Sequence, residues 1–133
     1  MILSLLAAIS LVPQADAQSR DTAGQLYDGC VRFVADADSA TDRGEAGATD
    51  CAVRAATMLA LDAVWDVTEE ANKGREAGRT ICLPDSITSQ GPEADPRLAE
   101  AFIAYVDAHP ATRREEPGLI FERALAEKWP CPR

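Results

Sequence analysis

The sequence predicts an all-α fold, a small bundle of four to five helices that disulfide bonds staple together. Apolar residues recur at helical spacing in several segments, and no segment shows the Val- and Ile-rich alternation that is typical of strands. Four cysteines are distributed along the 133 residues. A chain of this length is enough for one domain with one modest core.

Residues 1–17 carry the pattern of a secretory signal peptide. Residues 2–12 form an uncharged, mostly apolar run that no Lys or Arg precedes, and the small residues Ala15 and Ala17 follow at the positions that a signal peptidase reads. The run is too short to span a bilayer, and no other segment is apolar enough to do so. We therefore expect cleavage after Ala17 and a mature single helical domain at residues 18–133.

The charge of the chain is strongly acidic, with 22 Asp and Glu residues against 13 Lys and Arg residues and a net charge of −9. This balance argues against nucleic acid and anionic membrane surfaces as partners. It is consistent either with plain solubility or with a basic protein partner.

The first helix is expected over residues 22–38, with Asp21 as its N-cap. One face of this segment gathers its apolar residues at helical spacing, namely Leu26, Cys30, Phe33, Val34 and Ala37. Residues 39–49 are polar and rich in Gly and Ala, so we expect a connecting loop there.

The longest helix is expected over residues 51–72, capped by Thr49 or Asp50. Its broad apolar face would hold Val53, Met58, Ala60, Leu61, Val64, Trp65 and Val67. The opposite face would hold an acidic ridge, defined here as Asp62, Asp66 and Glu69. The ridge is either a solvated helix face or a surface that steers a basic partner. Trp65, like Trp129, is expected in the core.

Residues 85–95 follow Cys82-Leu83-Pro84 and have no apolar period. A long polar loop anchored beside a cysteine is suited to presenting recognition residues, although it can equally be a plain connection. The candidate contact residues in it are Ser86, Thr88 and Gln90.

Two further helices have clear start and stop signals. Asp95-Pro96 provides an N-cap followed by proline at the first helical position, and His109-Pro110 ends that helix. The last helix is expected from near Pro117 to just before Pro130. Their apolar residues are Leu98, Phe102, Tyr105 and Val106 in the first, and Ile120, Phe121, Ala124, Leu125 and Trp129 in the second.

An even number of cysteines behind an export signal predicts two disulfides. A short connection makes the first two helices antiparallel neighbours, so Cys30 and Cys51 are able to meet, which leaves Cys82 for Cys131. The alternative, in which Cys30 pairs with Cys82 or Cys131, stays open at this point.

The sequence gives little support for catalysis. It contains no CxxC pair, phosphate loop or Gly-x-Ser-x-Gly motif, so we expect no metal, no cofactor and no catalytic residues. The single histidine, His109, stands at a helix end before a proline. An enzymatic role would require a free cysteine near His109.

Several short motifs follow one another along residues 82–131. They are Cys82-Leu83-Pro84, Ile87-Thr88, Gln90, Phe102, Tyr105-Val106, His109-Pro110, Ile120, Ala124-Leu125 and Trp129-Pro130-Cys131. In these motifs the chain resembles the Rap/Tai family of type VI secretion amidase immunity proteins. Cys30 and Cys51 also fall where members carry cysteines on the first two helices. The chain departs from the family at Ala52-Val53-Arg54, where a Gly-aromatic-Ile run is usual.

The resemblance implies a non-enzymatic, periplasmic, all-helical binding protein. Such a protein binds a peptidoglycan amidase effector and blocks its catalytic cleft, often as a homodimer. We expect Ser86, Thr88 and Gln90 and the acidic ridge to supply the contacts. The alternative hypothesis is a stand-alone periplasmic helical protein with a stress or envelope role and no toxin partner.

Overall fold

The computed structural model describes residues 21–36, 46–71, 78–89 and 95–132; the predicted signal peptide lies outside these ranges. Within them the chain is all-α, as the sequence predicts, and it holds five α-helices and one 3₁₀ helix. The elements are α1 (Ala23–Asp36), α2 (Ala46–Ala71), α3 (Asp85–Thr88), α4 (Pro96–Ala108), η1 (Pro110–Arg114) and α5 (Pro117–Lys128). None of these helices is long and apolar enough to cross a membrane.

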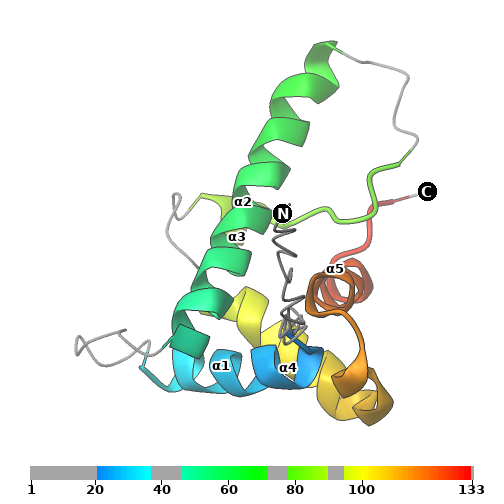
Figure 1. Cartoon of the computed structure of the whole chain (residues 1–133). Helices are drawn as coiled ribbons and strands as arrows, with labels where there is room; N and C mark the ends of the chain where they lie inside the picture. The colour runs from blue at the N-terminus through cyan, green and yellow to red at the C-terminus, as the bar shows by residue number, and fades with distance from the viewer. Residues whose placement is uncertain (1–20, 37–45, 72–77, 90–94, 133) are drawn as a thin grey trace, which may run out of the picture.

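The core lies where α1, α4 and α5 meet the first half of α2 (Figure 1). Phe102 of α4 and Phe121 of α5 pack with ring centroids 5.1 Å apart, and both are buried. The second half of α2 projects beyond this layer of helices in Figure 1. The longest helix of the described chain is thus packed at one end and extended at the other.

The predicted cap of α4 is confirmed, and α5 has a side-chain cap that was not predicted. The Asp95 carboxylate accepts a hydrogen bond of 2.8 Å from the Arg97 backbone N–H at the start of α4. At the start of α5, the Glu116 carboxylate accepts hydrogen bonds from the Gly118 and Leu119 N–H groups at 2.9 and 2.6 Å. Each side chain satisfies N–H groups that the helix itself leaves without partners.

The start of α2 differs from the prediction. Thr49 and Asp50 lie inside the helix rather than capping it, because α2 already begins at Ala46. The small residues there pack against α1: a Cβ atom on Gly29 would overlap the carbonyl group of Gly47. Contact between the two backbones stabilises a helical turn that contains Gly47, a residue of low helix propensity.

The structure pairs Cys30 with Cys51 and Cys82 with Cys131, with Cα–Cα distances of 5.1 and 4.9 Å. This is the pairing that the sequence favours. The first disulfide is buried and joins α1 to α2 beside the glycine contact. Around the second, an isolated antiparallel bridge joins Ile81 to Pro130, and the Cys82 N–H donates to the Trp129 carbonyl at 2.9 Å. The chain end after α5 is therefore fixed to the segment that leads into α3.

The buried face of α2 is not the predicted one. Residues 48, 51, 55, 59 and 62 point inward, at spacings of three and four, whereas Val53, Leu61, Val64 and Trp65 are exposed. The disulfide at Cys51 and the close contact at Gly47 set the rotation of α2 about its axis. Small side chains such as Ala48 and Ala55 fit the tight contact with α1, so packing at this point outweighs the more apolar opposite face.

Candidate functional site

The segment predicted as a recognition loop contains the one-turn helix α3. Ile87 is buried in the core and anchors this turn, while Ser86 is exposed and Thr88 is half-buried. Gln90 lies outside the described residues. The prediction of an irregular loop is therefore wrong for residues 85–88, because one apolar side chain gives this polar stretch an attachment to the core.

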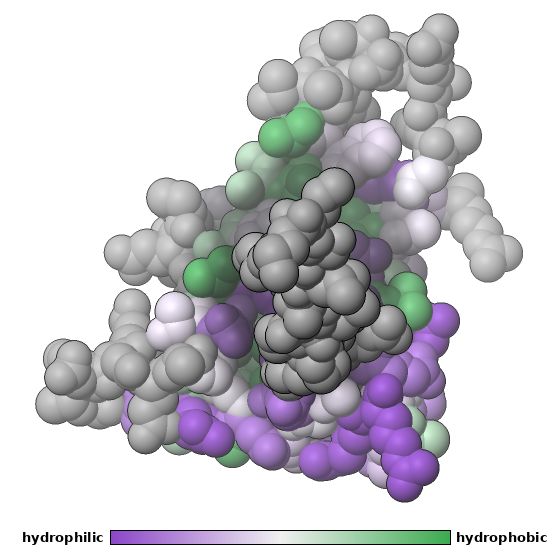
Figure 2. Space-filling model, viewed as in Figure 1, coloured by the Kyte–Doolittle hydropathy of each residue, from purple (hydrophilic) through white to green (hydrophobic). Residues whose placement is uncertain are grey.

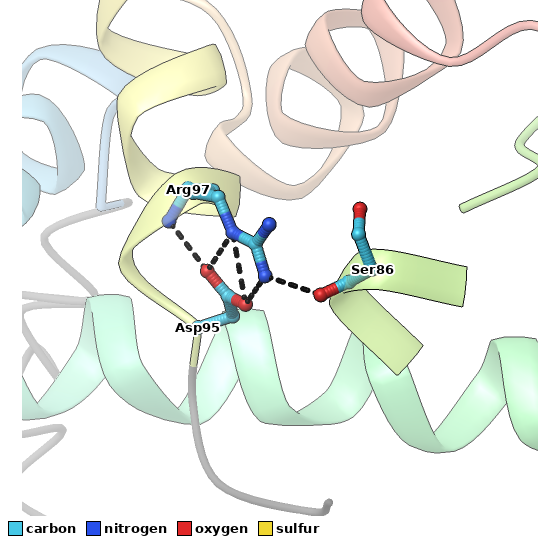
Figure 3. A network of polar contacts seen from close by, with 3 residues as sticks. All are labelled: Ser86, Asp95 and Arg97. Carbon is cyan, nitrogen blue, oxygen red and sulfur yellow. Dashed lines mark hydrogen bonds and ion pairs between the residues drawn. The ribbon is translucent and has the colours of Figure 1, made fainter. Parts of the chain in front are cut away.

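A polar clamp holds α3 to the start of α4 (Figure 3). The Arg97 side chain donates to both Asp95 carboxylate oxygens, with an Nη2–Oδ2 distance of 2.7 Å, and the same Nη2 donates to the Ser86 carbonyl at 2.7 Å. The Asp95 side chain is buried. Burial raises the pKa of the Asp95 carboxyl, but the hydrogen bonds and positive charge of Arg97 outweigh it, so the pKa lies below its usual value. The clamp therefore depends on an ionised Asp95.

This clamp predicts an acid-sensitive contribution to stability. The pKa of Asp95 is lowered on folding, so its stabilising effect is complete above the pKa of the unfolded chain and disappears as the pH falls through the folded value. Asp95→Asn should lower the free energy of unfolding at about pH 7, and its difference from the wild type should shrink below about pH 4. Urea unfolding across this range measures the difference. A difference that stays constant down to about pH 3 would contradict the role of ionised Asp95.

The acidic ridge does not exist as predicted, because Asp62 faces inward. Asp62 is only 5% exposed, and its carboxylate forms an ion pair of 2.8 Å with Arg79 Nη2. The Arg79 Nε group also donates to the Ile81 carbonyl at 3.3 Å. A buried carboxylate needs such a partner, so Asp62 is held by Arg79 and is not part of an exposed acidic surface. The side chains of Asp66 and Glu69 lie outside the described part of the structure.

An apolar stripe occupies the exposed face of α2 instead. We define the α2 stripe as Val53, Leu61, Val64 and Trp65, which are between 42% and 59% exposed. Figure 2 shows hydrophobic surface along the projecting part of α2, whereas the surface around α1 and η1 is mainly hydrophilic. The prediction of Trp65 as a core residue is wrong, while Trp129 packs partly buried against the core. Clustered exposed apolar side chains of this kind mark interaction surfaces.

Two adjoining hollows lie along one side of the α2 stripe, and residues of both α2 and α5 line them. One has a volume of about 350 Å³ and the other about 250 Å³. Met58, Leu61 and Glu122 line both of them. We call the continuous depression the α2–α5 groove.

His109 and the cysteines, which an enzymatic role would need, take part in contacts that support the fold. The His109 ring stacks on Tyr105 with centroids 4.3 Å apart, and its Nδ1 lies 2.9 Å from the Tyr105 carbonyl oxygen. All four cysteines are in disulfides. No thiolate is therefore present for His109 to activate.

Comparison with known proteins agrees with the sequence motifs. The family model of the Rap1a immunity proteins matches residues 22–131, which include every described helix. No curated protein and no solved structure matches the chain. Since the family match covers most of the 133 residues, the chain belongs to the Rap1a immunity proteins.

Proposed function

We propose that this protein is a periplasmic immunity protein that binds a peptidoglycan amidase effector of type VI secretion and occludes its catalytic cleft. The observation that carries the proposal is the α2 stripe on a member of an immunity family. An immunity protein acts by binding a protein effector, and the stripe offers apolar area for that purpose.

The sequence and the disulfides support the target and the compartment in this proposal. The motifs of residues 82–131 resemble those of amidase immunity proteins, and residues 1–17 have the pattern of an export signal. Disulfides persist in oxidising compartments such as the periplasm, where an amidase delivered from outside meets its substrate. The same resemblance suggests a homodimer.

The test uses any amidase that is encoded beside the gene of this protein. The mature chain should bind the purified amidase and abolish its hydrolysis of peptidoglycan at equimolar concentration. In cells that export the amidase, only the exported form of this protein should prevent lysis; a form lacking residues 1–17 serves as the control. If the mature chain neither binds nor inhibits the amidase, the proposed function is wrong. The stand-alone envelope role then takes its place.

A further inference from the structure

We propose that the α2–α5 groove receives an apolar segment of the effector that is flanked by Lys or Arg residues. This inference rests on the proposed function, since it names the part of the effector that the immunity protein recognises. It derives from the shape, the lining and the charge of the groove.

The floor and one wall of the groove are apolar. Phe121 of α5 is buried at its base, Met58 is partly buried, and Leu61 belongs to the exposed α2 stripe. Val53 and Trp65, also of the stripe, line opposite ends of the groove. An elongated apolar depression between two helices suits an inserted segment of chain better than a small polar ligand.

Acidic side chains stand around this apolar floor. Asp21, Asp50 and Glu122 line the groove and are exposed, and no ion pair between described residues neutralises them. The basic residues of the lining have acidic neighbours. Arg79 pairs with Asp62, and Arg54 lies close to the carboxylate of Glu116.

Arg54 and the Glu116 carboxylate both lie beside Gly118, each within 3.3 Å of the position that a Cβ atom there would take. Hydrogen bonds from the Gly118 and Leu119 N–H groups lower the pKa of Glu116, and the positive charge of Arg54 adds to this effect. Four acidic residues line the groove, Asp21, Asp50, Asp62 and Glu122, against the two basic residues Arg54 and Arg79, so negative charge prevails over it.

Charge selects the occupant of the groove. Basic residues beside the inserted apolar side chains would lie against the acidic rim and accelerate association. A second copy of this chain fits less well: in a twofold symmetric contact the same patch meets itself, which would bring the carboxylates of both copies together.

Two matched pairs of variants test the groove against the amidase that the wild type binds, with binding measured by calorimetry. Leu61→Asn alters the groove, whereas Leu119→Asn changes a residue of similar exposure, 43% against 48%, outside the groove lining. Glu122→Lys reverses a rim charge, whereas Glu127→Lys reverses an exposed charge elsewhere on α5. Thermal unfolding checks that each variant is folded.

Leu61→Asn should weaken binding by about 30-fold, the effect of losing an interface hot spot. Glu122→Lys should weaken it by roughly tenfold and reduce its dependence on salt concentration. Both control variants should bind as the wild type does. A photo-crosslinking amino acid at Thr57, an exposed residue of the groove lining, should capture an apolar effector peptide that contains Lys or Arg.

The outcomes separate this inference from the proposed function. If the wild type inhibits the amidase and both groove variants bind equally well, the groove inference is wrong and the function stands. Crosslinking of Thr57 to a second copy, or to an effector segment without basic residues, also overturns it. If the wild type binds no amidase encoded beside its gene, both proposals are wrong.

Discussion

Replacing both Cys82 and Cys131 with alanine should lower the free energy of unfolding by about 4 kcal/mol. The disulfide closes a loop with a sequence separation of 49, and its loss restores conformational entropy to the unfolded chain. Because a domain of this size is stable by only about 5–15 kcal/mol in total, the variant should lose a large part of its stability. Urea unfolding of the wild type and the variant measures the difference.

The double variant Cys30→Ala and Cys51→Ala gives a comparison. Its loop is shorter, with a separation of 21, so the entropic part of its effect is about 3 kcal/mol. Its two sulfur atoms are also buried, so their removal leaves a cavity that adds to the loss. A loss below about 1 kcal/mol for the Cys82 and Cys131 variant would show that the loop is already constrained without the disulfide.

Gly29→Ala should destabilise the protein by about 3 kcal/mol, although alanine favours helix formation. The new methyl group would overlap the backbone carbonyl of Gly47, and a backbone atom cannot move aside as a flexible side chain does. Relief requires α1 and α2 to separate, yet the disulfide between Cys30 and Cys51 holds them together one residue away from Gly29.

Chemical denaturation measures this effect, and Asp28→Ala is the matched control. Asp28 is the neighbouring residue on α1 and is exposed, so its substitution should change stability by at most about 0.5 kcal/mol. If Gly29→Ala were as stable as the control, the close approach of the two helices would be wrong.

Local signals predicted the second half of the chain well. Asp95-Pro96 and the stretch from Glu116 to Pro117 fix where α4 and α5 begin, and Pro110 and Pro130 lie just beyond their ends. These signals act through the dihedral angles and hydrogen bonds of a few adjacent residues, so they depend little on the rest of the fold. The turn α3 was missed because its stability comes from the buried Ile87 and not from a helical pattern.

The orientation of α2 shows where such reasoning fails. Apolar residues lie on more than one side of this helix, and hydrophobicity alone favoured the wrong side. A signal for the correct face was present in the sequence: a cysteine that joins two packed helices must face the neighbouring helix. Asp62 stands eleven residues after Cys51, about three helical turns on the same face, which places it inward. The exposure of the α2 stripe was missed for the same reason, because its residues were assigned to the packed face of the helix.

The position of a proteolytic cut relative to the two disulfides decides whether the resulting pieces stay covalently joined. A single backbone cut between Cys30 and Cys51, or between Cys82 and Cys131, leaves two pieces that a covalent bond still joins. A cut between Cys51 and Cys82 separates the chain into two halves, which are then held only by noncovalent contacts such as the ion pair of Asp62 with Arg79. Among cuts in the interior of the chain, one between the two disulfides is therefore the cut that can release half of the molecule.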